Sequence, residues 1–272
     1  MLERVNRGGL DMLAAGQLEK RGFVVAFSGR QGGSSVGDYA GLNLSYKVGD
    51  DSRAVNSNRK LLAEALGIPV EQWVLPQQVH GCTVNEVGVN ETGRGAMDFA
   101  SGIPGTDGLA TEMSDVAIGV LTADCLPVVF VALKGRAVAV AHAGWRGVLG
   151  GIAIVAAKKL AAFCGSGTAE LYAFIGPHIR SCCMEVDAVV AGLFEDRFKG
   201  AVVRPSTEGK SLVDLEFACR QQLTGAGLIP RNVFDAGICT VCDPGYFSYR
   251  GSGGTCGRQG AIAAMVDNSG DP

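Results

Sequence analysis

The sequence predicts one α/β domain over residues 1–272, built on a mixed β-sheet. Apolar, β-branched-rich runs of strand length alternate along the chain with segments of helical periodicity. A short turn, Lys134-Gly135-Arg136, joins two such runs and predicts a hairpin, which a purely parallel sheet would lack. The hydrophobic content of 47% is sufficient for a large core.

The expected strands are apolar runs bounded by turn residues. In chain order they cover 24–27, 72–80, 83–87, 116–120, 128–133, 137–141, 171–175, 232–238 and 261–266. The first expected helix starts at an N-cap cluster, residues 50–52, and runs through about residue 66. The other expected helices cover 147–163, 185–198 and 215–223. The first helix has clear ends, because the acidic cluster precedes it and Gly67 and Pro69 follow it.

Charge and composition exclude several classes of protein. A net charge of −3 and a pI of 5.7 give no general electrostatic case for binding nucleic acid or an anionic membrane. The longest apolar stretch, 116–133, contains Asp124 and Pro127, so no membrane span is expected. The N-terminus lacks the apolar core of a signal peptide, and the nine scattered cysteines indicate reduced thiols. We therefore expect a cytoplasmic protein.

Two of the three histidines follow apolar runs in Gly-flanked turns, "QQVHG" with His80 and "AHAGWRG" with His142. A third run leads into "LTADCLPV", which holds Cys125. A turn centred near Gly135 would place His142 opposite Val128 and bring Cys125 within roughly 11 Å of it along the sheet. Imidazole and thiolate within reach of each other indicate a zinc or copper site, or a Cys–His nucleophile pair. Spacing alone does not bring His80 to them.

The motifs "QQVHG", "TADCLPVVF" and "AHAGWRG" resemble the three signature motifs of the YfiH-like laccase-domain family. The resemblance covers nearly the whole chain and includes "PGTDGL", "IGPHI" and "GRQGA". It implies mixed sheets flanked by helices in a layered sandwich. It also implies that His80, Cys125 and His142 together bind one catalytic metal ion, usually zinc.

The activity implied by this resemblance is that of a purine nucleoside phosphorylase and adenosine deaminase. A phosphorylase, a transferase, would convert adenosine, inosine, guanosine or methylthioadenosine with phosphate to the base and ribose 1-phosphate. A deaminase, a hydrolase, would convert adenosine to inosine. Three protein ligands leave a fourth metal position open, and metal-bound water can have a pKa of about 7, which suits such hydrolysis.

Phosphorolysis also requires cationic or N–H donors for phosphate. The candidate substrate contacts are Arg59, Arg146, Arg250 and Arg258. Asp124, beside Cys125, is a further candidate, either to orient a ligand or as acid or base. His178 is expected not to be a ligand. Cys182-Cys183 and Cys239-x-x-Cys242 could indicate a second metal, but a lone C-x-x-C is half a zinc site, so these four cysteines are interpreted as structural thiols.

Three other functions stay open at this stage. A copper-dependent polyphenol oxidase, laccase-like, would use the same two histidines and cysteine, but a multicopper enzyme needs a further histidine cluster and only His178 is left. A cysteine hydrolase would use Cys125 as the nucleophile. A non-enzymatic protein would bind nucleosides without turnover.

Overall fold

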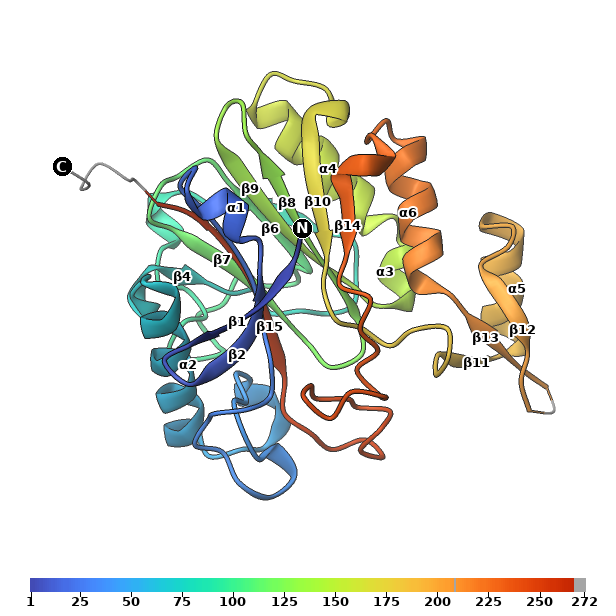
Figure 1. The fold of residues 1–272 in the computed structure, drawn as a ribbon, viewed down its shortest axis with the longest axis horizontal. Coiled ribbons are helices and arrows are strands. Elements are labelled where there is room, and N and C mark those ends of the chain that lie inside the picture. Colours follow the sequence, from blue (N-terminus) through green and yellow to red (C-terminus); the bar gives the residue numbers. More distant parts are fainter. Residues whose placement is uncertain (208, 267–272) are drawn as a thin grey trace.

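Two six-stranded sheets lie face to face at the centre of the computed structural model, which describes residues 1–207 and 209–266 (Figure 1). The first sheet has the order β1 (Glu3–Arg7), β2 (Leu10–Ala14), β3 (Phe23–Ser28), β15 (Gln259–Met265), β7 (Ala117–Thr122), β4 (Trp73–Val74). The second has the order β14 (Val233–Asp235), β10 (Leu171–Ile175), β8 (Leu126–Ala132), β9 (Ala137–Ala143), β6 (Gly108–Thr111), β5 (Val84–Glu86). Both sheets combine parallel and antiparallel pairs, as the sequence predicted.

The core between the sheets follows from the alternation of side chains along each strand. Val129 and Val131 of β8, with Val138 and Val140 of β9, pack toward the first sheet. Their neighbours along the strands, such as Phe130, pack on the opposite face against helices. Because both faces of this sheet are covered, its strands are apolar at nearly every position.

Helices form the outer layers. The first sheet is covered by α2 (Ser52–Leu66), through Leu62, Ala63 and Leu66. The second sheet is covered by α3 (Trp145–Gly150), α4 (Ile152–Phe163) and α6 (Leu215–Gly225). A short α1 (Gly16–Glu19) packs on β3. The expected layered sandwich of mixed sheets flanked by helices is therefore confirmed.

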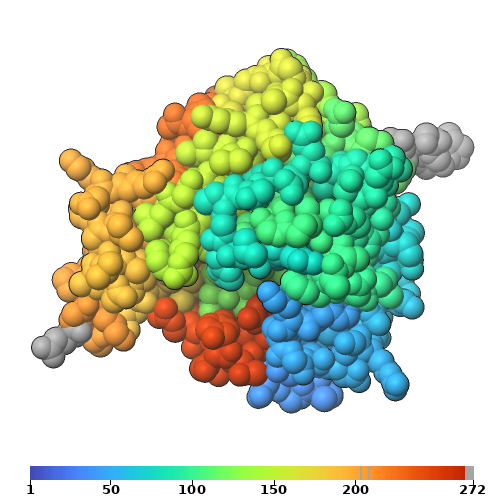
Figure 2. Space-filling view, turned by 180° about the vertical axis from the view of Figure 1, so that it is seen from behind, coloured from blue at the N-terminus to red at the C-terminus, as the bar shows by residue number. Residues whose placement is uncertain are grey.

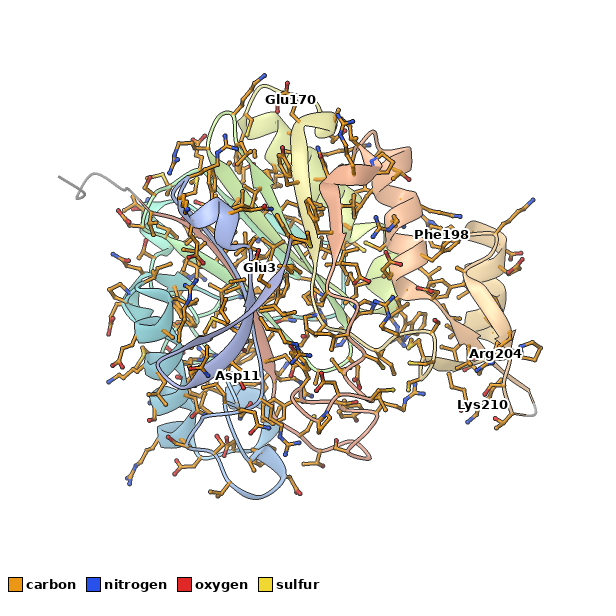
Figure 3. The ribbon with its side chains drawn as sticks, in the orientation of Figure 1. Glu3, Asp11, Glu170, Phe198, Arg204 and Lys210 are labelled. Carbon is orange, nitrogen blue, oxygen red and sulfur yellow. The ribbon has the colours of Figure 1, made fainter. Side chains whose placement is uncertain are left out.

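A small unit projects from one side of the sandwich (Figure 1). It contains α5 (Ala188–Arg197) and a three-stranded sheet of order β11 (Glu185–Asp187), β13 (Lys210–Val213), β12 (Val202–Pro205). Figure 3 places Arg204 and Lys210 at its outer end. The expected helix over 185–198 was wrong at its start, because residues 185–187 pair with β13 and Asp187 then caps α5.

Other expected elements differ in their ends. The helix over 147–163 begins earlier, at Trp145, and is divided at Gly151, whose φ of +82° ends α3. The strands over 72–80 and 232–238 shorten to β4 and β14. No strand was predicted from the sequence at β1, β2, β6, β11, β12 or β13. No helix within the described ranges is long and apolar enough to cross a membrane. The assignment of residues 1–272 to one domain stays a prediction.

Candidate functional site

Two loops and the end of a strand bring His80, Cys125 and His142 together. His80 follows β4, Cys125 stands directly before β8, and His142 is the penultimate residue of β9. One nitrogen of each imidazole and Sγ of Cys125 lie within 4.8 Å of one another. The two imidazole rings meet edge to face, with centroids 4.7 Å apart. Two nitrogens and one sulfur suit zinc or copper, so the group could hold one metal ion.

The β8–β9 hairpin puts Cys125 and His142 at the same end, in a register one residue from the predicted one. His142 pairs with Pro127, and Val128 pairs with Ala141. The prediction that His142 lies opposite Val128 was wrong because the loop spans 133–136, an even number of residues whose centre precedes Gly135. The observed register places Cys125 closer to His142 than expected.

The absence of a side chain at Gly144 provides space in which the three side chains meet. A Cβ at this position would lie 3.1 Å from Sγ of Cys125 and 3.2 Å from Cδ2 of His80. Its backbone is extended, with φ of −62°, so conformation alone does not require glycine here. Glycine is favoured at this position because Cys125 and His80 approach it closely.

Asp107 organises the site, and the sequence analysis did not identify it. This residue is 0% exposed, and its carboxylate accepts a 2.8 Å hydrogen bond from Nδ1 of His142. It also accepts the backbone N–H groups of Val79, His80 and Gly81, at 2.7 to 3.2 Å. One carboxylate therefore fixes both histidines. The available signal was the acid within "PGTDGL", one residue ahead of a short strand.

His80 is held in an uncommon backbone conformation. Its φ of +62° is left-handed, a region that non-glycine residues adopt rarely. The N–H groups on both sides of it and its own N–H all point to Asp107. These bonds hold a conformation that turns an exposed histidine toward Cys125.

The three titratable groups of the site shift one another's pKa. Burial raises the pKa of Cys125, but His142 and His80 lower it further, to about 6. Burial lowers the pKa of His142, but Cys125 and Asp107 raise it, to about 9. For Asp107, burial is opposed by hydrogen bonds from His142 and Gly81, and the net pKa is lowered. The site favours a thiolate, the form that binds metal.

A cavity of about 550 Å³ contains the three side chains. In Figure 2 a recess opens between the red segment near residue 250, the blue segment near residue 45, and the green segments above them. Its lining includes aromatic and basic side chains that were not among the expected substrate contacts, notably Tyr46, Lys47, Phe99 and Tyr249, together with Trp145 of the "AHAGWRG" motif. They come from separate loops and from the start of α3, without shared periodicity, so no sequence pattern joins them.

Asp124 lines the cavity, but its carboxylate is occupied. Oδ1 accepts a 2.6 Å hydrogen bond from the Thr240 hydroxyl, and Oδ2 accepts one of 2.6 Å from the Arg250 backbone N–H. Its φ is +87°, another left-handed position. Asp124 therefore ties the segment around residues 240–250 to the residue next to Cys125.

The four candidate arginines have different environments. Arg250 and Arg258 line the cavity, and the guanidinium of Arg258 lies over the Tyr249 ring. Arg59 also lines it but is buried, and its guanidinium donates to the carbonyls of Leu44, Gly95 and Ala96. Burial lowers the pKa of Arg59 to about 10. Its N–H groups are therefore largely used within the fold.

Arg146 does not line the cavity. It is exposed at the start of α3, and its guanidinium lies 4.2 Å from the centre of the Trp145 ring. Trp145 lines the cavity, whereas Arg146, the next residue in the first turn of α3, does not. The expected anion contact at Arg146 thus has no support from the geometry.

A second group of side chains that could hold a metal ion consists of Cys182, Cys183, Cys239 and Cys242. The sequence analysis treated them as structural thiols. His178 belongs to neither group found among the described residues. It is 0% exposed, and its Nδ1 donates to the Gly176 carbonyl at 2.9 Å.

Comparison with known proteins gives consistent results. A family model described as "Multi-copper polyphenol oxidoreductase laccase" matches residues 24–266. Purine nucleoside phosphorylase YlmD of Geobacillus stearothermophilus is 38% identical over 241 residues, covering 87% of this chain and 88% of that protein. Adenosine deaminase RL5 of an unknown prokaryotic organism is 35% identical over 226 residues, covering 81% and 85%.

Two solved structures share the fold. The crystal structure of the hypothetical protein YfiH from Bacillus licheniformis has a TM-score of 0.89 at 29% identity, covering 93% of this chain and 96% of that one. The crystal structure of YlmD from Geobacillus stearothermophilus has a TM-score of 0.88 at 36% identity, covering 94% and 96%.

Proposed function

This chain belongs to the multi-copper polyphenol oxidoreductase laccase family, and on that premise we propose that it is a purine nucleoside enzyme. It cleaves adenosine, inosine, guanosine or methylthioadenosine with phosphate to the base and ribose 1-phosphate, and it hydrolyses adenosine to inosine and ammonia. The names of two relatives, a purine nucleoside phosphorylase and an adenosine deaminase, support both reactions.

The observation that carries the proposal is the convergence of His80, Cys125 and His142 inside a cavity. The cavity volume of about 550 Å³ lies within the roughly 300–1,000 Å³ usual for small-molecule sites. The same cavity has aromatic faces and basic side chains, which suit a purine and a phosphate respectively. A nucleoside and an anion can therefore meet beside the three side chains.

Zinc is the ion proposed for this group, with copper as the alternative. His80, Cys125 and His142 fit it by donor type, by spacing and by the space kept free at Gly144. Three protein ligands leave a position for water or substrate, as catalytic zinc sites do. When bound, such an ion polarises a substrate oxygen or nitrogen and lowers the pKa of a bound water.

Asp107 prepares the histidines for that role. It accepts a hydrogen bond from Nδ1 of His142, so Nε2 is the ring nitrogen that would bind the ion once it has lost its proton. It also holds the backbone of His80 through three N–H groups. The protein thereby sets the ring orientations before substrate binds, without a rearrangement during the reaction.

For phosphorolysis, Lys47, Arg250 and Arg258 are the cations proposed to bind phosphate. A phosphate oxygen attacks C1′ of the ribose, the bond from C1′ to the purine nitrogen breaks, and the base leaves with the proton that hydrogen phosphate loses. Tyr46 and Phe99 offer ring faces for the purine. Arg59 is proposed to act indirectly, by holding Tyr46, since its guanidinium lies 4.3 Å from that ring's centre.

The test is incubation of the purified protein with adenosine, with and without phosphate, followed by chromatography. We expect inosine in both samples and adenine with ribose 1-phosphate only when phosphate is present. Cys125→Ala should abolish both reactions. Cys164→Ala, at a partly exposed cysteine outside the cavity, should abolish neither. Absence of all three products from zinc-loaded protein would refute the nucleoside function.

Copper-dependent polyphenol oxidation is the second candidate, favoured by the description of the family. His178 is the one histidine left for a further copper cluster, and it is completely buried. One copper per chain with an intense visible thiolate band, and oxidation of phenols, would favour the oxidase. A cysteine hydrolase would instead keep its activity after chelation and lose it after alkylation of Cys125.

A further inference from the structure

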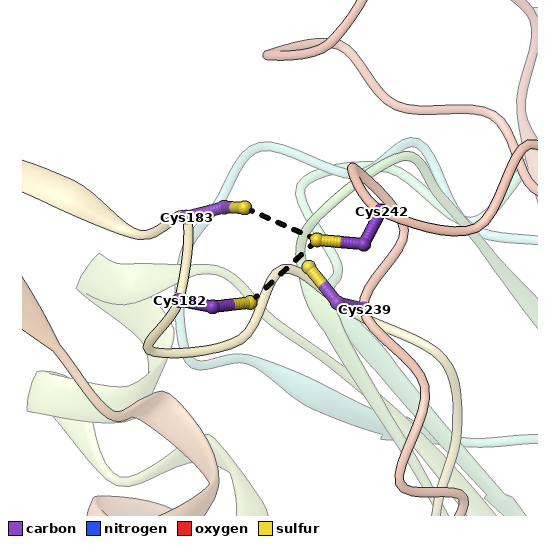
Figure 4. A group of neighbouring side chains, drawn as sticks. All are labelled: Cys182, Cys183, Cys239 and Cys242. Atoms are coloured by element: carbon purple, nitrogen blue, oxygen red, sulfur yellow. Dashed lines mark hydrogen bonds between the residues drawn. The ribbon is translucent and has the colours of Figure 1, made fainter.

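Four cysteine side chains converge outside the cavity, from two distant segments of the chain (Figure 4). Cys182 and Cys183 lie between β10 and β11, and Cys239 and Cys242 lie between β14 and β15. All four sulfur atoms are within 4.8 Å of one another. Sγ of Cys242 is 3.5 Å from Sγ of Cys183 and 3.8 Å from that of Cys182.

The sheet brings these segments together. β10 and β14 are parallel neighbours, so the segments that follow them leave the same end of the sheet. The pairing continues past the strands as a parallel bridge between His178 and Cys239, and the Thr240 N–H donates to the His178 carbonyl at 3.1 Å. The cysteines meet because the backbone pairing between these two segments continues to within a few residues of each cysteine pair.

The Cys239-x-x-Cys242 segment is folded as a tight turn around its first sulfur. The N–H groups of Cys242 and Asp243 donate to the Cys239 carbonyl, at 3.2 and 3.0 Å. This turn brings the sulfurs of Cys239 and Cys242 within 4.8 Å of each other, close enough to share one ion.

We propose that Cys182, Cys183, Cys239 and Cys242 bind one structural zinc ion. Zinc–sulfur bonds of about 2.3 Å in a tetrahedron place the sulfurs about 3.8 Å apart, and the two measured separations are 3.5 and 3.8 Å. A multi-iron cluster would hold the sulfurs further apart, because sulfide ions stand between them. Four protein ligands close the coordination shell, so the site is structural and not catalytic.

The proposed zinc joins two segments that both reach Asp124. Beyond Cys239, the Thr240 hydroxyl donates to the Asp124 carboxylate. Ahead of Cys182, the Ile179 N–H donates to the Asp124 carbonyl at 2.9 Å. The ion would therefore stabilise the cavity wall next to Cys125 from outside, without touching substrate. The proposal holds whether or not the nucleoside activity is found.

The experiment uses the full chain with Cys125→Ser, which removes a ligand from the cavity group and leaves the four cysteines intact. After zinc loading and dialysis under reducing conditions, we expect about one zinc per chain. Cobalt loading should give the absorption of a tetrahedral four-thiolate site. Adding Cys242→Ser should abolish both signals, and adding Cys164→Ser as a matched control should preserve them.

Zinc should also raise the thermal midpoint of Cys125→Ser by about 5 °C or more and protect the four cysteines from alkylation, as read by mass spectrometry. These two measurements remain decisive if the Cys242→Ser variant does not fold. Three results would overturn the proposal: no zinc retained by Cys125→Ser, zinc content unaffected by Cys242→Ser, or a Cys183–Cys242 disulfide in protein isolated under reducing conditions.

Discussion

The two groups of side chains that could each hold a metal ion differ in their placement within the fold. Cys125 and His142 lie at adjoining ends of β8 and β9, and His80 lies in the loop between β4 and β5. All three face a cavity of about 550 Å³. The four cysteines come from loops at one end of the second sheet, and Cys182 and Cys242 are exposed. The first group has three ligands and a supporting carboxylate, Asp107, whereas the second has four ligands.

This contrast separates two uses of a metal ion. An open position beside a cavity allows substrate to reach the ion, and a closed shell of four thiolates only joins segments of chain. Changes at the first group should therefore alter catalysis more than stability, and changes at the second should do the opposite. The predictions below test that separation.

The largest effect is expected from His80→Ala, because an ion acting as a Lewis acid supplies several kcal/mol to the reaction. We expect the rate of inosine formation to fall about 1,000-fold. Because His80 is exposed, the thermal midpoint should change little. Cys242→Ser is the counterpart, and it should lower the midpoint while keeping the rate within tenfold. If both variants lose the same activity, the separation of roles is wrong.

Asp107→Asn should have the next largest effect. The amide keeps the size of the carboxylate but loses the charge that faces His142 and the N–H groups of residues 79–81. Loss of such a supporting group typically lowers metal affinity about 10- to 100-fold. Competition with a chelator measures it in a Cys242→Ser background, with exposed Asp38→Asn as the control. Unchanged affinity would show that Asp107 does not orient His142.

Gly144→Ala should weaken zinc binding at the cavity about tenfold, or ~1.4 kcal/mol. The added Cβ would lie 3.1 Å from Sγ of Cys125, and the backbone tolerates alanine. Gly192→Ala in α5 is the matched control, because a Cβ there has no atom within 4 Å. The same competition assay compares the two variants. Equal affinities would mean that Cys125 does not need the space at Gly144.

The last prediction concerns how zinc affinity at the cavity depends on pH. Between the Cys125 pKa of about 6 and the His142 pKa of about 9, the free site carries one proton that zinc must displace. Affinity should therefore rise about tenfold per pH unit in this range and more steeply below it. Titrations of Cys242→Ser at several pH values measure the slope. A flat profile would contradict the thiolate–imidazolium pair.

The sequence predicted the parts of the fold that local patterns determine. Asp51 caps α2 and Gly67 ends it, as expected from these residues alone. The apolar runs of β8 and β9 identified the hairpin that carries Cys125 and His142. The strands β11, β12 and β13 were missed because they have only three or four residues each, too short for a period to show. The division of helix 147–163 was missed although the pair Gly150-Gly151 is a turn signal within it.

The part of the site that was predicted from the sequence is the part that the family-like motifs contain. His80, Cys125 and His142 were identified in this way and do converge. Asp107 was missed because its role depends on backbone N–H groups 26 to 28 residues earlier in the chain. The four cysteines were interpreted as structural thiols and not as a metal site, because Cys242 is 59 or 60 residues from Cys183 and Cys182 in the chain. The two pairs meet only through the parallel pairing of β10 and β14.

Anomalous diffraction at the zinc absorption edge, from crystals of zinc-loaded protein, tests the contrast between the two groups most directly. We predict two peaks. One should lie within bonding distance of His80, Cys125 and His142 with a further position open to the cavity, and one should lie among the four cysteines. A zinc-loaded crystal without a peak beside Cys125 would contradict the assignment of the cavity group as the catalytic metal site.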